Sequence, residues 1–215
     1  MPIRKIPKNY RSVTGTFASI KNGCNIFYES LLERDFFLTL EFDENVKSYE
    51  EQPIQIFYKH LNKNIRYTPD CLVHYKDNRL PCIYEVKYSN EIKEKKVFLK
   101  QKFDQIEEYL DKNDMEFKLF TELDINPIYL ENIKFLYNFS VLKDISKTDL
   151  IKKLFKNKKL ESYENILKIY STNKYEQAEI IPYIWHLVLT NYLTTDLNKP
   201  FSKKTILKVK DNDKT

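Results

Sequence analysis

The chain has 215 residues, of which 42% are hydrophobic and 31% charged, and its formal net charge is +5. This composition predicts a soluble globular protein with one large domain or two small ones. Only two glycines occur, which excludes a glycine-rich phosphate loop and a dinucleotide fingerprint, and no apolar run is long enough to span a membrane.

The chain begins with a basic, irregular stretch over residues 1–24, which predicts a basic N-terminal arm. Two later segments are also basic: residues 143–168 hold eight Lys against four acids, and residues 199–215 hold six Lys against two acids. Basic ends around an acidic middle suit a protein that binds DNA phosphates with its flanks and a metal ion with its centre. The alternative is that these lysines only solvate exposed faces, as charge runs commonly do.

A broad apolar pattern over residues 26–42 predicts a largely buried helix. Glu33 falls on the same apolar face as Phe36 and Leu40. A carboxylate that is buried without a partner costs several kcal/mol, roughly, so Glu33 needs a partner such as Arg34, a helix end in solvent, or a role in a site.

Short strands are predicted at residues 46–50 and 54–58, with a bend at Pro53, which cannot donate to a strand ladder. Two β-rich runs, residues 66–75 and 81–88, then flank a polar turn, which indicates a hairpin.

This hairpin carries the charges of a candidate active site. Asp70 lies at the start of its first strand, and Glu85 and Lys87 lie two residues apart in the second, so both point to one face. Carboxylates are the ligands that hard divalent cations prefer, and a neighbouring lysine can stabilise charge on a phosphate. The pattern therefore predicts a nuclease-type site.

The elements after the hairpin complete a first domain. An amphipathic helix is predicted over residues 90–112, a strand over 117–121, and a helix that begins at Asn126-Pro127. The order of elements predicts an α/β fold, with a mixed sheet flanked by helices, over residues 25–143.

A second domain is predicted over residues 144–215. Three helices precede two short strands around residues 198–202, which is a winged-helix pattern typical of docking to DNA or protein. Lys199, Lys203 and Lys204 in this segment are our candidate DNA-binding residues.

The cysteines exclude a simple metal or disulfide framework. Cys24, Cys71 and Cys82 are odd in number and form no C-x-x-C pair, which predicts free thiols in a reducing cytosol. The N-terminus also lacks an apolar signal core, so we expect a cytoplasmic protein.

The combination of a helical glutamate, Pro69-Asp70 and Glu85-x-Lys87 resembles the restriction-endonuclease-like P-D…E-x-K nucleases. The chain is more closely similar to the TnsA family, the endonuclease subunits of heteromeric transposases. The segments that carry this resemblance are residues 30–36, 41–46, 50–53, 66–73, 84–87 and 192–201.

The resemblance implies catalytic roles for Glu33, Asp70, Glu85 and Lys87, with Gln52 in support. Glu33, Asp70 and Glu85 would hold Mg²⁺, for which Mn²⁺ substitutes; some relatives have Gln at the position of Glu85. It also implies hydrolysis of double-stranded DNA at the 5′ ends of a transposon, together with a TnsB-like recombinase and a TnsC-like ATPase. Such a protein is expected at the bacterial nucleoid.

Two other functions remain open from the sequence. One is a restriction or repair nuclease that acts without transposase partners. The other is a DNA-binding scaffold without catalysis, in which the acids only form ion pairs in the core.

Overall fold

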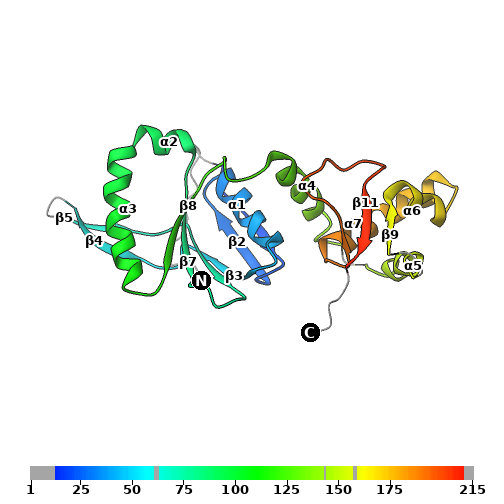
Figure 1. The fold of residues 1–215 in the computed structure, drawn as a ribbon, viewed down its shortest axis with the longest axis horizontal. Coiled ribbons are helices and arrows are strands. Elements are labelled where there is room, and N and C mark those ends of the chain that lie inside the picture. The colour runs from blue at the N-terminus through cyan, green and yellow to red at the C-terminus, as the bar shows by residue number, and fades with distance from the viewer. Residues whose placement is uncertain (1–12, 61–62, 143, 157–158, 211–215) are drawn as a thin grey trace. The chain divides into compact units, whose positions relative to one another are not determined.

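The computed structural model describes residues 13–60, 63–142, 144–156 and 159–210 (Figure 1). Its contacts divide the chain into two compact units, one ending at Ile125 and the other beginning at Asn126. We placed the boundary near residue 144 from the sequence. The boundary in the structure lies nearer the N-terminus because helix α4 (Pro127–Tyr137) packs against α7 (Lys174–Leu189) of the second unit. No helix in the described residues is long and apolar enough to cross a membrane.

The first unit is built on a four-stranded sheet with the order β3-β6-β7-β8. The first three strands pair antiparallel, and β7 pairs with β8 in parallel, so the predicted mixed sheet is confirmed. The central strand β7 is almost wholly buried, as its run of apolar residues requires. The strands are β3 (Val46–Glu51), β6 (Cys71–Tyr75), β7 (Cys82–Val86) and β8 (Glu116–Phe120).

Helices cover both faces of this sheet (Figure 1). Helix α1 (Leu31–Phe42) buries Phe36 and Phe37 against one face. Helix α3 (Lys96–Asp111) buries an apolar stripe against the other face. The helix predicted over residues 90–112 is divided in two, because the backbone leaves helical geometry at Lys95 between α2 (Ser89–Glu94) and α3.

The structure replaces part of the predicted arm with a hairpin. Strands β1 (Gly15–Ser19) and β2 (Cys24–Tyr28) pair antiparallel, and α1 begins at Leu31 rather than near residue 26. The hairpin belongs to the core because Ile26 is 1% exposed. Its turn is held by Glu41 of α1, which accepts hydrogen bonds from two backbone N–H groups of the turn. Residues 1–12 of the predicted arm lie outside the described residues.

A separate two-stranded ribbon, β4 (Ile56–His60) and β5 (Lys63–Tyr67), precedes the site. The run predicted as one strand over residues 66–75 is therefore two strands in different sheets. The break falls at Pro69, which lacks an N–H and cannot continue a ladder.

The second unit contains the predicted helices and terminal strands together with one strand that we did not predict. Its order is α4, α5, β9, α6, α7, β10, β11, and β11 is the central strand of a three-stranded sheet. Trp185 of α7 stacks on Phe201 with ring centroids 4.7 Å apart, which fixes the loop before β11 on the helices. The remaining elements are α5 (Thr148–Leu154), β9 (Leu160–Ser162), α6 (Tyr163–Tyr170), β10 (Leu193–Thr194) and β11 (Ile206–Val209).

Candidate active site

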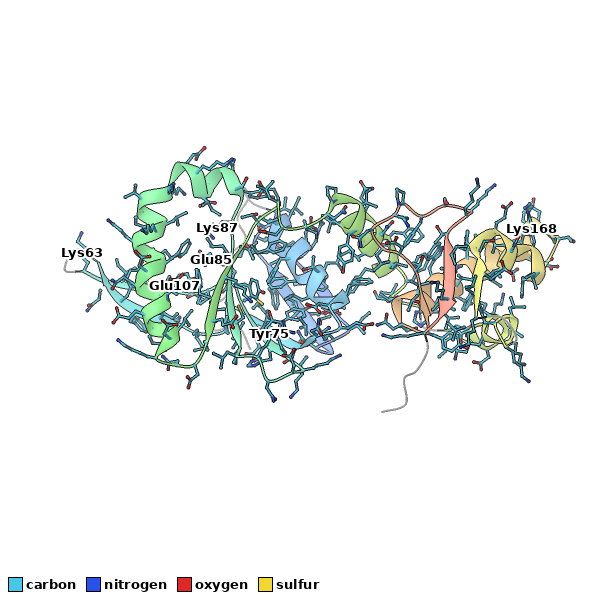
Figure 2. The ribbon with its side chains drawn as sticks, in the orientation of Figure 1. Lys63, Tyr75, Glu85, Lys87, Glu107 and Lys168 are labelled. Atoms are coloured by element: carbon cyan, nitrogen blue, oxygen red, sulfur yellow. The ribbon has the colours of Figure 1, made fainter. Side chains whose placement is uncertain are left out.

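The register of β6 and β7 brings Asp70, Glu85 and Lys87 together. Cys71 pairs with Tyr84, so Asp70, one residue earlier, reaches the end of β7. Its Oδ2 accepts a hydrogen bond of 2.7 Å from the backbone N–H of Val86 and lies 3.7 Å from Nζ of Lys87. Figure 2 shows Glu85 and Lys87 close together at this end of the strand. The predicted convergence of these three charges is confirmed.

Glu85 is enclosed by three donors and its side chain is only 3% exposed. Its Oε1 lies 3.0 Å from Nζ of Lys102 and 3.2 Å from Nζ of Lys87. Its Oε2 accepts a hydrogen bond from the hydroxyl of Tyr67. Both carboxylate oxygens are therefore engaged, which makes this buried charge tolerable.

Lys102 and Tyr67 were missed in the sequence. Lys102 comes from α3, and its Nζ also lies 4.0 Å from the centroid of the Tyr67 ring. The available signal was helical spacing: Lys102 falls three residues after Leu99 and four before Ile106, both buried. A lysine in an apolar stripe needs a buried anion as its partner.

Glu33 lies at the first turn of α1 in a reciprocal capping box. Its backbone N–H donates to Oγ of Ser30, the N-cap residue, and the Ser30 hydroxyl donates to Oε1 of Glu33 at 3.0 Å. Oε2 accepts from the backbone N–H of Glu29 at 2.8 Å. Arg34 bonds to Asp35 and is not the partner of Glu33. The Ser30-x-x-Glu33 spacing was the sequence signal for this cap.

Gln52 connects the Glu33 segment to Asp70. Its backbone N–H donates to the carbonyl of Asp70 at 3.1 Å, and its Nε2 donates to Oε1 of Glu29 at 3.1 Å. Gln52 has a φ of 46°, in the left-handed region that costs a residue with a side chain about 1–2 kcal/mol. Its Oε1 is buried and accepts no hydrogen bond within the described residues. Gln52 therefore lies beside Asp70 in a conformation that is unfavourable in free energy.

Burial and the charge of Glu85 raise the pKa of Asp70 to about 8; Lys87 opposes this rise and Glu33 adds to it. Burial also raises the pKa of Glu33, while the charge of Lys87 lowers it. For Lys87, burial disfavours the charge, but the carboxylates of Asp70 and Glu85 outweigh it and raise its pKa. The charges of Glu85 and Glu33 thus favour a proton on Asp70 at neutral pH, while Lys87 stays charged.

The structure tests how a divalent cation fits this site. No group of three or more His, Cys, Asp or Glu side chains within the described residues is already arranged to hold a metal ion. The carboxylate oxygens of Glu85 and Glu33 are already engaged by lysine, tyrosine, serine and backbone donors. Oδ1 of Asp70, in contrast, has no such donor among the described residues. The donor chemistry fits a hard cation, because a cation would relieve the repulsion at Asp70.

The predicted DNA-binding lysines lie on the second unit. Lys199 and Lys204 line a surface cavity of about 630 Å³, together with Lys208. Nζ of Lys199 lies 3.0 Å from Asp196 and its side chain is 80% exposed. Lys203 does not line this cavity.

A mixed sheet that presents an aspartate, a glutamate and a lysine at adjacent strand ends is an arrangement typical of nucleases. The family model for the TnsA-like endonuclease N-terminal domain matches residues 43–122, and the model for the TnsA endonuclease C-terminal domain matches residues 124–197. This chain belongs to the TnsA endonuclease family. No curated protein sequence matches the chain.

Proposed function

We propose that this chain is the subunit of a transposase that hydrolyses the non-transferred strand at the 5′ ends of the transposon. The observation that carries this proposal is the position of Lys87, 3.7 Å from Asp70 and 3.2 Å from Glu85, within a chain of the TnsA family. A TnsB-like recombinase would join the 3′ ends, and a TnsC-like ATPase would link the complex to its target.

The reaction would require Mg²⁺ or Mn²⁺, held by Asp70 with Glu33 and Glu85. When bound, such a cation makes a water more acidic and offsets charge on the scissile phosphate. The raised pKa of Lys87 keeps its amine protonated at neutral pH. Lys87 would therefore donate a hydrogen bond to a phosphate oxygen rather than remove a proton from water.

The second unit would act as a winged-helix docking module for transposon DNA. The order of the elements that follow α4, namely helix, strand, two helices and two strands, supports this proposal. The lysines Lys199, Lys203 and Lys204 would contact phosphates. The whole protein would work on DNA at the bacterial nucleoid.

The test is a reconstituted transposition reaction with the wild-type chain or Asp70→Asn, in the presence of the recombinase and the ATPase. Asp70→Asn should abolish cleavage at the 5′ ends while 3′ joining continues, so cointegrates replace simple insertions. Asp77→Asn is the matched control, because Asp77 is an exposed acid in the turn of the same hairpin and pairs with Arg79.

The outcomes separate the alternatives. Simple insertions by Asp70→Asn would contradict the catalytic assignment and favour a scaffold. Specific cleavage of DNA by the purified wild-type chain alone would instead favour a nuclease that acts without partners.

A further inference from the structure

The β4–β5 ribbon differs in charge from the chain that precedes it. Residues 53–69 contain Lys59, Lys63 and Arg66 and no Asp or Glu, whereas residues 41–51 contain five acids and one Lys. The ribbon is therefore a cationic segment that directly follows an acidic one. A local positive charge of this kind favours the binding of a polyanion.

The two faces of the ribbon have different environments. Ile56 and Tyr67 are buried and belong to the apolar cluster under α3. On the opposite face, Phe57 pairs with Arg66 across the two strands. Phe57 is 66% exposed, and Arg66 is exposed without an ion pair among the described residues. An exposed aromatic ring beside an exposed guanidinium offers a partner both apolar contact and paired hydrogen-bond donors.

The ribbon runs directly into the candidate active site. Tyr67, its last residue, donates a hydrogen bond to Glu85, and Asp70 follows three residues later. Tyr58 is also close to this site: burial raises its pKa, and the charge of Glu85 raises it further. Figure 2 shows Lys63 at the far end of the ribbon from Glu85. The ribbon thus extends outward from the catalytic carboxylates, and Arg66 and Lys63 lie along its strand β5.

We propose that this ribbon binds the duplex DNA that flanks the scissile phosphate, with Phe57 and Arg66 on its outer face and Lys63 at the end of β5 that is farthest from the site. This inference rests on the proposed function. The guanidinium of Arg66 matches a phosphate with two donors, and Phe57 packs on the sugars or the groove floor. A partner protein is the other class of occupant, but a surface with cations and no acid favours DNA.

The first test measures salt-dependent binding of the full-length chain to a fluorescent duplex with a transposon end. The variant Lys63→Gln/Arg66→Gln is compared with Lys47→Gln/Lys112→Gln, which removes the same charge from an exposed residue of β3 and from the exposed C-cap residue of α3. The slope of log affinity against log salt should fall by about two for the ribbon variant, since each phosphate contact contributes roughly 0.9. The control should keep the wild-type slope. Equal slopes in the two variants would overturn the proposal.

The second test places a photoreactive p-benzoyl-phenylalanine at position 57 in the assembled complex. Crosslinks to DNA beside the cut site support the proposal, and crosslinks to a partner protein alone overturn it. Neither result depends on catalysis. In the assembled complex, a wild-type chain that binds DNA and cuts it, with ribbon variants that do so equally well, would refute this inference and leave the proposed function standing. A wild-type chain that neither binds nor cuts DNA in that complex would refute the proposed function itself.

Discussion

Lys102 Nζ lies 3.0 Å from Oε1 of Glu85, so helix α3 contributes a charge to a site that otherwise comes from strand ends. The pair is almost fully buried, with side-chain exposures of 15% for Lys102 and 3% for Glu85. It holds Glu85 in place, while Lys87 lies 3.2 Å from Glu85 and 3.7 Å from Asp70. Lys102 is therefore a positioning residue.

Lys102→Met should lower the free energy of unfolding by about 3 kcal/mol, because it removes one partner of a buried ion pair. In a double-mutant cycle, Lys102→Met with Glu85→Gln should cost less than the sum of the single changes. Urea titration measures both. Lys100→Met, an exposed neighbour on α3, is the control and should stay within about 0.5 kcal/mol of wild type. Additive effects would mean that the pair is not coupled.

The stability of the metal-free protein should fall as pH rises from about 4 to about 8. The pKa of Asp70 is raised from 3.8 to about 8, so the folded state binds the proton more tightly than the unfolded state over this window. Asp70→Asn should remove this slope and be more stable than wild type at pH 9. Thermal unfolding at several pH values checks it, and a wild-type curve that is flat in this window would contradict it. Asp77→Asn should not change the slope.

Mg²⁺ should stabilise the wild-type chain, and the variants should differ in how much of this effect they retain. Asp70→Asn should abolish it, because Asp70 has a carboxylate oxygen that meets no donor among the described residues. Glu85→Gln should retain part of it, because both oxygens of Glu85 are already engaged by Tyr67 and lysines. The shift in melting temperature with added Mg²⁺ measures this. Equal losses in the two variants would make Glu85 a full ligand.

Gln52→Gly should be more stable than Gln52→Ala by about 1 kcal/mol. Both variants lose the hydrogen bond to Glu29, but only glycine adopts a φ of 46° without strain. Chemical denaturation measures the difference. If alanine were equally stable, the strain at this position would be absent. In the assembled complex both variants should cut more slowly than wild type, because Gln52 ties Asp70 to the segment that bears Glu33.

Neutralising Lys203 and Lys204 should weaken DNA binding and reduce its salt dependence by up to two phosphate contacts. Lys199→Gln should have a smaller effect, because Asp196 already lies 3.0 Å from the Lys199 amine. Lys168→Gln is the control: Lys168 lies on α6 (Figure 2) and pairs with Glu164. Anisotropy titrations at several salt concentrations measure these effects. An unchanged slope for all variants would mean that these lysines only solvate the surface.

The sequence by itself determined those parts of the site that depend on local periodicity. Glu85 and Lys87 share a face because strand side chains alternate, and Asp70 meets them because a hairpin folds one strand onto the next. The mixed sheet with flanking helices followed in the same way from apolar patterns and turn residues. Ser30-x-x-Glu33 is an equally local helix-cap signal, which our prediction of a helix from residue 26 did not use.

Only the tertiary structure decided which groups surround these charges. Tyr67 and Lys102 come from separate elements, and their side chains meet Glu85 only when the ribbon and α3 pack on the same face of the sheet. The β1–β2 hairpin joined the core for a similar reason, since Glu41 of α1 caps its turn from 20 and 21 residues away in the chain. Burial then raised the pKa of Asp70, because desolvation depends on how the whole unit closes around the carboxylate.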